Sequence, residues 1–308
     1  MKLLIELPTW LGDCVMATPA IENIIQKFPR SELIFIGSSV PIELMENHPN
    51  CRQVFILEKN LNGLRNQAKK LGKFDLFISF RSSIRSKFLK YFVNAEKKFQ
   101  FKKKKYPTGH QVEKYNSFIN SSLNLNNPPS KLKIYNQFYS HSKKKPLLGI
   151  SPGASYGSAK CWPHEKFTEV VISLSSRFDI LIFGGPKEEV LAEKITYQLK
   201  ESNCKNFTNL VGKTNINELV NYLSSLDLFI TGDSGPMHIA ASLKIPTVTI
   251  FGPTKALETG QWMNKKSIIL KKELPCQPCM KRVCPLGHHD CMRKISSEEV
   301  INSALSLI

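Results

Sequence analysis

The chain has 308 residues, of which 42% are hydrophobic and 22% charged, and its formal net charge is +18. This length is typical of two domains of about 150 residues, and the hydrophobic content excludes a wholly disordered protein. Eight cysteines are too few for a disulfide scaffold. The positive charge predicts an anionic partner, which could be nucleic acid, a membrane surface or a phosphorylated ligand.

The start of the chain shows neither a membrane span nor a signal peptide. No segment approaches the roughly 18–20 consecutive apolar residues of a transmembrane helix. The first apolar run, MKLLIELP, is interrupted at Glu6 and is too short for the apolar region of a signal peptide. We therefore expect a cytoplasmic protein, in which thiols are normally reduced.

The first half of the chain alternates short apolar runs with helical patterns. Strands are predicted at 2–7, 32–37, 54–57 and 74–80, and helices at 19–28, 42–46 and 61–71. Strands separated by single helices predict βαβ units and a parallel sheet.

Most of the net charge lies in residues 85–145, which contain fifteen Lys or Arg and two acidic residues. Aromatic residues such as Phe88, Tyr91, Phe101 and Tyr106 are interleaved with them. A basic and aromatic stretch is typical of nucleic-acid binding and equally of an anionic membrane surface, and a solvated lysine-rich face is a third possibility. No RNP, zinc-finger or helix-turn-helix signature accompanies it, which disfavours nucleic acid.

Residues 124–146 are polar and predict a linker, after which the alternating pattern restarts. Strands are predicted at 147–151, 180–184, 228–231 and 247–251, and helices at 165–176, 188–201, 216–224, 237–243 and 296–308. Ser296 or Ser297 would cap the last helix. Two successive parallel α/β domains separated by a cleft follow from this pattern. Ligands of such sheets bind at the carboxyl ends of the strands.

The loop after the first strand reads PTWLGDCVMATPA and carries Asp13. An ordinary Asp has a pKa of about 3.9, so its carboxylate is ionised at neutral pH and can accept a proton. The alternative is a structural role as a helix N-cap, in which Asp is common.

Two loops in the second half have the composition of phosphate-binding loops. SPGASYGSAKCWPHEKF offers backbone N–H groups, hydroxyls and Lys160, although it lacks the Walker A spacing. FITGDSGPMHIAAS leads from a strand into a helix that Pro236 would open, with His238 in its first turn. GDSG also occurs in chymotrypsin-like proteases, but those are all-β proteins and need a further glycine.

A fourth segment, PCQPCMKRVCPLGHHDCM, gathers four cysteines and two histidines. These are zinc-ligand residue types with a C-x-x-C start, but the second half fits no ordinary finger spacing. Three interpretations stay open: reduced thiols in a compact loop, a structural zinc site, or a disulfide. The residues concerned are Cys276, Cys279, Cys284, Cys291, His288 and His289.

Together these segments resemble the ADP-heptose:lipopolysaccharide heptosyltransferases of glycosyltransferase family 9, and most of all the heptosyltransferase II branch. LGD, SPGA…AKCWP, GDSGPMHIAASLKIPTVTIFGPT and CxxCxxxxCPLGHHxCM appear in family order across nearly the whole chain. The resemblance implies a GT-B fold of two Rossmann-like domains with parallel sheets facing a central cleft. It implies an acceptor domain at 1–145, an ADP-heptose domain at 146–295 and a helix at 296–308 that returns to the N-terminal domain.

The resemblance also assigns roles to individual residues. Asp13 would be the general base, with Thr9 and Gly12 lining the acceptor side. The donor-binding residues would be Lys160 at the phosphates, Asp233, Ser234, Gly235 and His238 at the pyrophosphate and heptose, and Gly185, Glu188 and Thr214 near the ribose and adenine.

The implied reaction is an inverting transfer of L-glycero-D-manno-heptose from ADP-heptose onto heptosyl-Kdo-lipid A, as the second heptose of the lipopolysaccharide or lipooligosaccharide core. No cofactor or metal site is expected, since no DxD-type carboxylate pair stands at a donor loop, so no divalent metal is required. We expect a monomer that touches the anionic inner face of the cytoplasmic membrane and binds no nucleic acid. The alternatives are a heptosyltransferase for another core position, a GT-B nucleotide-sugar epimerase or, more remotely, a basic nucleic-acid-binding protein.

Overall fold

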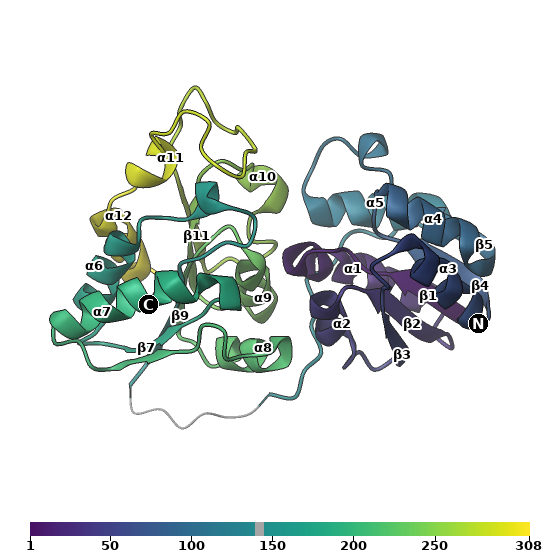
Figure 1. The fold of residues 1–308 in the computed structure, drawn as a ribbon, viewed down its shortest axis with the longest axis horizontal. Coiled ribbons are helices and arrows are strands. Elements are labelled where there is room, and N and C mark those ends of the chain that lie inside the picture. Colours follow the sequence, from purple (N-terminus) through teal and green to yellow (C-terminus); the bar gives the residue numbers. More distant parts are fainter. Residues whose placement is uncertain (139–144) are drawn as a thin grey trace. The chain divides into compact units, whose positions relative to one another are not determined.

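The computed structural model describes residues 1–138 and 145–308, which form two compact units, Met1–Asn136 and Gln137–Ile308 (Figure 1). The boundary falls somewhat before the expected break after Lys145. Residues near 133 still pack on the first unit, where the Lys133 N–H donates to Thr18 Oγ1 at 3.1 Å. Of the basic residues predicted in the linker, Lys143 and Lys144 lie outside the described residues.

The first unit is a five-stranded parallel sheet in the order β3-β2-β1-β4-β5. Its strands are β1 (Lys2–Glu6), β2 (Glu32–Gly37), β3 (Cys51–Ile56), β4 (Lys73–Ser79) and β5 (Asn94–Gln100). Its helices are α1 (Leu11–Lys27), α2 (Ser39–Met45), α3 (Leu61–Lys70), α4 (Ile84–Phe92) and α5 (Gln111–Leu123), with a 3₁₀-helix at Lys103–Lys105. Leu3, Leu4 and Ile5 of β1 are fully buried, as expected for a central parallel strand covered on both faces.

Helix α1 begins at Leu11, well before Pro19, where the sequence pattern placed its start. A proline within a helix lacks the N–H that would bond the carbonyl four residues earlier. Here the Thr18 hydroxyl donates to that carbonyl, Val15 O, at 2.7 Å and replaces the missing donor. Asp13 therefore lies in the first helical turn. Trp10 is the N-cap, so the alternative role of Asp13 as an N-cap is wrong.

The described part of the basic segment, residues 85–138 and 145, includes most of α4 and all of β5 and α5, and its aromatic residues divide between the core and the surface. Phe101 is only 4% exposed, and its ring centroid lies 5.0 Å from that of Tyr115. Tyr91 is 78% exposed on α4. Part of the basic and aromatic pattern is therefore core packing behind an edge strand, and edge strands commonly carry lysine because it opposes pairing with other chains.

The second unit is a six-stranded parallel sheet in the order β11-β10-β9-β6-β7-β8. Its strands are β6 (Leu147–Ser151), β7 (Asp179–Ile182), β8 (Phe207–Asn209), β9 (Leu228–Gly232), β10 (Thr247–Phe251) and β11 (Ser267–Lys271). Its helices are α6 (His164–Leu174), α7 (Glu189–Glu201), α8 (Ile216–Ser224), α9 (Gly235–Leu243), α10 (Ala256–Thr259), α11 (Asp290–Arg293) and α12 (Ser297–Leu305), with 3₁₀-helices at Ser158–Lys160 and Pro186–Glu188. The order is that of a Rossmann sheet. The sequence pattern missed β8, β11, α10 and α11.

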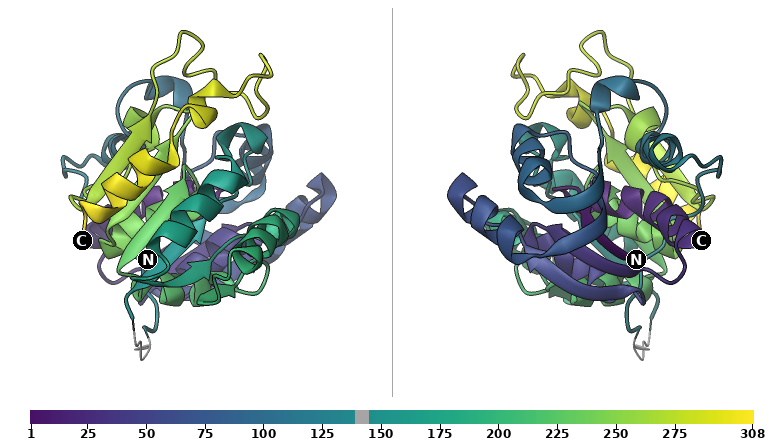
Figure 2. Two further views of the ribbon diagram at one scale, coloured as in Figure 1. Left: turned by 90° about the vertical axis from the view of Figure 1, so that its left-hand side faces the viewer. Right: turned by 90° about the vertical axis from the view of Figure 1, so that its right-hand side faces the viewer.

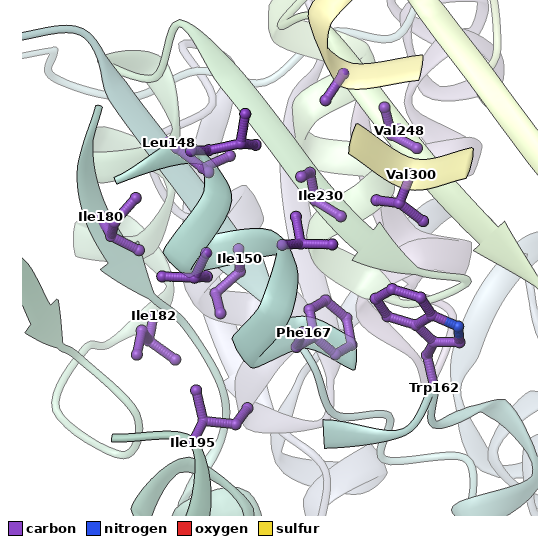
Figure 3. Close-up of a cluster of buried hydrophobic side chains, with 14 of the residues drawn as sticks. Leu148, Ile150, Trp162, Phe167, Ile180, Ile182, Ile195, Ile230, Val248 and Val300 are labelled. Atoms are coloured by element: carbon purple, nitrogen blue, oxygen red, sulfur yellow. The ribbon is translucent and has the colours of Figure 1, made fainter. Parts of the chain in front are cut away.

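The core of the second unit joins its central strands to the helices on one face (Figure 3). Ile150, Ile230 and Val248 from three adjacent strands pack with Phe167 of α6 and with Trp162. The Trp162 indole N–H also donates to the Ile295 carbonyl at 3.2 Å, so the segment before α12 is held to the loop that follows β6.

Helix α12 begins with the expected capping box, because Ser296 Oγ accepts from the Glu299 N–H at 3.1 Å and Glu299 Oε2 accepts from the Ser296 N–H at 2.7 Å. The expected return of this helix to the N-terminal domain depends on how the two units are placed and stays a prediction. Val300 and Ala304 are fully buried in the core of the second unit, where α12 packs on α6 and β10 (Figure 2). Its apolar face covers the sheet of its own unit. No helix in the described part of the chain is long and apolar enough to cross a membrane.

Candidate active site

In the second sheet the chain leaves β6 in opposite directions, toward β7 on one side and toward β9 on the other. Loops that follow the two strands flanking such a switch point separate at the carboxyl edge, and the crevice between them is where open α/β sheets bind ligands. The loop after β6 carries Lys160, and the loop after β9 carries Asp233.

These two side chains meet in an ion pair. Lys160 Nζ lies 2.6 Å from Asp233 Oδ2 and donates to the Asp233 carbonyl at 3.1 Å. The Thr254 hydroxyl, from the loop after β10, donates to the same carboxylate oxygen at 2.6 Å. The Lys160 side chain is 13% exposed and that of Asp233 5%. Asp233 therefore holds the lysine ammonium in place, and the Lys160 side chain stays partly exposed.

Helix α9 begins directly beside this ion pair. Ser234 is its N-cap residue, and the Ser234 side chain makes no capping hydrogen bond. Uncapped N–H groups and the helix dipole favour an anion at this point. Gly235 is the first helical residue, so Pro236 stands one position later than expected. His238, also in this turn, is buried.

A second group of predicted donor residues meets where the loops after β6 and β7 approach each other. Glu188 Oε2 accepts from the Gly185 N–H at 2.8 Å. A Cβ at Gly153 or Gly184 would overlap the Glu188 side chain, so the two glycines leave the space that this carboxyl group occupies. Burial raises the pKa of the Glu188 carboxyl group.

Thr214 was predicted to lie with this second group. It is half-buried in the segment between β8 and α8. In the part of the chain that the structure describes, neither Gly185 nor Glu188 hydrogen-bonds to it. The structure thus brings Gly185 and Glu188 together without adding Thr214 to their contact.

The predicted acceptor-side residues lie in the first unit, between β1 and the first turn of α1. Asp13 is half-buried, Gly12 is buried and Thr9 is exposed, with its carbonyl accepting from Ser38 Oγ at 3.2 Å. Tyr115 of α5 lies near Asp13: burial, and then the Asp13 charge, raise the pKa of the Tyr115 hydroxyl well above its ordinary value.

Residues 65–289 match the family model described as glycosyltransferase family 9 (heptosyltransferase). The chain is also 42% identical, over all of its length and 98% of the other, to lipooligosaccharide heptosyltransferase 2 of Campylobacter jejuni serotype O:2. The chain belongs to glycosyltransferase family 9. It is therefore a glycosyltransferase, as its motifs implied.

Solved structures of this family share the architecture. The structure of Escherichia coli ADP-heptose LPS heptosyltransferase II superimposes with a TM-score of 0.81 at 20% identity, covering 100% of this chain and 98% of that one. A family 9 glycosyltransferase from Veillonella parvula gives a TM-score of 0.85 at 22% identity, covering 99% and 96%. These likenesses confirm the GT-B fold with two Rossmann-like domains.

The cysteine-rich segment of this family 9 chain lies against the loop that carries Lys160. The His289 ring nitrogen Nε2 is 2.9 Å from the Ala159 carbonyl, and the Ala159 N–H donates to the Arg282 carbonyl at 3.0 Å. The Tyr156 hydroxyl donates to the Met280 carbonyl at 2.7 Å. The segment therefore fixes the conformation of the loop after β6.

The four clustered cysteines line one small cavity of about 20 Å³ together with His288 and His289. All eight cysteines of the chain lie in its described part, and each is free. Backbone N–H groups, that of His289 foremost, lower the pKa of Cys284, whereas burial raises that of Cys291 to about 11. Within residues 1–138 and 145–308, no set of three or more His, Cys, Asp or Glu side chains has a geometry that could hold a metal ion.

Sequence reasoning missed one polar cluster, which lies at the end of β1. Glu6 is 1% exposed and accepts hydrogen bonds from Ser79 Oγ at 2.6 Å and Ser86 Oγ at 2.8 Å. Arg81 Nη1 lies 3.6 Å from it. Burial outweighs these partners, so the pKa of Glu6 is raised. The available signal was an acid at the end of an otherwise apolar strand, because such an acid must find buried donors.

Proposed function

We propose that this family 9 enzyme transfers L-glycero-D-manno-heptose from ADP-heptose to heptosyl-Kdo-lipid A, as the second heptose of the lipooligosaccharide or lipopolysaccharide core. The observation that carries the proposal is the Lys160–Asp233 pair beside the N-terminus of α9, a site suited to a diphosphate. Full-length identity of 42% to a protein named lipooligosaccharide heptosyltransferase 2 supports the acceptor position.

The donor binds at the switch point of the second sheet. Its pyrophosphate takes the backbone N–H groups of Ser234 and Gly235 and the ammonium of Lys160, with His238 below them in the first turn of α9. The ribose lies toward Gly185 and Glu188, whose buried carboxyl group can bind sugar hydroxyls, and the adenine lies toward Thr214. Asp233 keeps its contact with Lys160 and so orients the cation that faces the phosphates.

The reaction is a single displacement with inversion at the anomeric carbon. Asp13 takes the proton of the acceptor hydroxyl as that oxygen bonds to the anomeric carbon and the bond to the ADP oxygen breaks. General-base assistance of this kind contributes about 10²–10⁴-fold. Negative charge grows on the departing ADP, and Lys160 and the α9 N–H groups stabilise it more in the transition state than in the ground state. These groups supply the positive charge at the phosphates, so the proposed mechanism uses no cofactor.

The lysine-rich edge, Lys97 with Lys102 to Lys105, suits an acceptor embedded in an anionic bilayer. All five of these side chains are exposed. Burial, and then the charges of Lys102 and Lys98, lower the pKa of nearby Lys90, which shows how densely positive charge is gathered here. We propose that a monomer docks through this edge on the inner face of the cytoplasmic membrane. Each lysine near an anionic surface contributes on the order of 1 kcal/mol.

The test of membrane docking is charge reversal within Lys102–Lys105. The apparent KM for acceptor in anionic vesicles should rise, while the KM for ADP-heptose stays constant. The same rise with acceptor in neutral detergent micelles, or equal effects on both substrates, would contradict docking on an anionic surface.

The test of the proposed function is ADP release from ADP-heptose with and without defined acceptors. Release should require mono-heptosylated Kdo-lipid A, and the product should carry two heptoses. Transfer only to an acceptor of another length would indicate a different core position. Conversion of the nucleotide sugar without any acceptor would indicate an epimerase. Salt-sensitive retention on DNA without affinity for nucleotide sugar would indicate a nucleic-acid-binding protein.

A further inference from the structure

The carboxyl edge of the first sheet contains two arginines whose hydrogen-bonding capacity is largely unused. Arg81 lies two residues after β4, and Arg85 is in the first turn of α4. Nε of Arg81 and both Nε and Nη2 of Arg85 are buried without a hydrogen-bond partner in the described residues. Buried donors of a charged group are costly to leave unpaired, so this arrangement needs an explanation.

The atoms left unpaired on Arg85 form one edge of its guanidinium group. The N–H bonds of Nε and Nη2 point in the same direction and match the two oxygens of a carboxylate or phosphate. Two parallel N–H donors without an acceptor are the arrangement expected of a binding site for such an anion. Lysine, with a single ammonium group, could not reproduce this pairing.

Glu6, the acid beside the two arginines, neutralises only part of their positive charge. Glu6 lies beside both arginines: burial raises the pKa of its carboxyl group, and the charges of Arg81 and Arg85 act in the opposite direction. Its oxygens already accept from Ser79 and Ser86, and its nearest guanidinium atom, Arg81 Nη1, is 3.6 Å away. Two guanidinium groups against one carboxylate leave a net positive charge in the cluster.

The cluster lies at the switch point of the first sheet, the position that corresponds to the Lys160–Asp233 pair in the second. β1 pairs with β4 through Glu6 and Ser79. The loop after β1 leads to Asp13, and the loop after β4 carries Arg81. Phe80, between Ser79 and Arg81, packs on Tyr115 with ring centroids 5.3 Å apart, and the Asp13 charge acts on Tyr115. The proposed base and the arginines therefore border the same edge of the same sheet.

We infer that Arg81 and Arg85 form an anion subsite of the acceptor pocket, which binds a carboxylate or phosphate of the acceptor beside the hydroxyl that reacts. The inference rests on the proposed function, since the proposed acceptor carries both kinds of anion, carboxylates on Kdo and phosphates on lipid A. Arg85 makes the bidentate contact, and Arg81 adds a second donor and charge.

The experiment replaces Arg85 by lysine, which keeps the charge and removes the fork. Arg65→Lys is the matched control, because Arg65 is an exposed arginine of the same unit that lies over the Phe92 ring. We expect Arg85→Lys to raise the KM for acceptor at least tenfold, with unchanged affinity for ADP-heptose and unchanged melting temperature. Arg65→Lys should alter none of these. An unchanged acceptor KM in Arg85→Lys would overturn the subsite.

The two possible anions are distinguished with modified acceptors. One has its Kdo carboxylates methyl-esterified, and the other has its lipid A phosphates removed. The modification that deletes the bound anion should weaken the wild type about as much as Arg85→Lys does, and should have little further effect in that variant. If both modifications weaken wild type and variant by equal factors, Arg85 contacts neither anion and the inference fails.

Direct binding separates this inference from the proposed function. Calorimetric titration of mono-heptosylated acceptor needs no turnover. Binding that Arg85→Lys weakens, in an enzyme that transfers no heptose to this acceptor, would overturn the proposed reaction and keep the subsite. Transfer by the wild type with equal acceptor binding in Arg85→Lys and Arg65→Lys would keep the reaction and overturn the subsite.

Discussion

The two units place strands in the same order around a central strand, but the buried charges at their switch points differ. Those of the second unit are balanced, and those of the first have an excess of positive charge. In the second unit one lysine is paired with one aspartate, and the aspartate also accepts from Thr254. In the first unit two arginines face a single glutamate that two serines already occupy. A switch point thus provides a crevice, while the balance of buried charges decides whether its cations are held by the protein or left for a ligand.

The largest effect is expected from replacing Asp13, the proposed general base, because none of the proposed donor residues has this role. Asp13→Ala should lower kcat by about 10²–10⁴-fold, because it removes the proton acceptor. Calorimetry should show nearly unchanged ADP-heptose binding, since Asp13 belongs to helix α1 of the other unit. Asp13→Asn, which keeps the shape, should be as inactive as Asp13→Ala. Turnover close to that of the wild type in either variant would refute the assignment of the base.

Lys160→Ala tests whether the second switch point depends on its internal ion pair. Donor binding and kcat should both fall, because the cation is proposed to touch the phosphates in the ground state and in the transition state. The variant should also lose about 3–5 kcal/mol of unfolding free energy, since Asp233 remains buried without its partner. Urea denaturation measures this loss.

A double variant separates stability from function at the same pair. Lys160→Met with Asp233→Leu removes both charges, so much of the lost stability should return. Donor affinity should stay low. Recovery of donor binding along with stability would show that Lys160 acts on the fold alone.

The titration of Glu6 at the first switch point should make the free energy of unfolding depend on pH. Its folded-state pKa is raised by burial, so the native protein binds this proton more tightly than the unfolded chain. The stability associated with protonated Glu6 is complete below the unfolded value of about 4.3 and is lost as pH rises through the folded pKa. Wild type should therefore lose unfolding free energy relative to Glu6→Gln over this rise. A constant difference between them would contradict the raised pKa.

The smallest effect concerns thiol reactivity, which also differs between the two regions. Burial and the adjacent Asp13 charge raise the pKa of Cys14 in the first unit, whereas that of Cys284 in the second is lowered. Because thiolates are the reactive form, iodoacetamide at pH 8 should modify Cys284 before Cys291 and leave Cys14 unmodified in the native protein. Peptide mass spectrometry gives the order. Early labelling of Cys14 would show that α1 opens readily.

The sequence predicted buried strands well and edge strands poorly, for a physical reason. The buried strand β10 matches its expected range. The helix α8 was also expected at 216–224 and spans Ile216–Ser224. β5, with the sequence NAEKKFQ, was missed because an edge strand has too little buried surface to show a hydrophobic pattern. The start of α1 was predicted too late, at Pro19, because the sequence does not show that the Thr18 hydroxyl replaces the missing N–H donor of the proline.

Candidate site residues were predictable where they follow a recognisable strand. Lys160 and Asp233 were found in this way, and the structure brings them together. Arg85 was read as a member of the basic stretch 85–145 and Arg81 was not singled out, because their relation to Glu6 depends on the pairing of β1 with β4. Contacts between residues more than seventy positions apart need the strand order, which local patterns do not contain.

The packing of α12 on α6 and β10 has a consequence for the order of events during synthesis. The sheet of the first unit is complete at Gln100 and its last helix at Leu123, so this unit can fold while the ribosome is still translating the second. The second unit needs Val300 and Ala304 to close its core. Domains fold as units, the N-terminal one first. The half of the molecule proposed to bind the nucleotide sugar is therefore the last to mature, and until then the apolar surface that α12 covers is exposed.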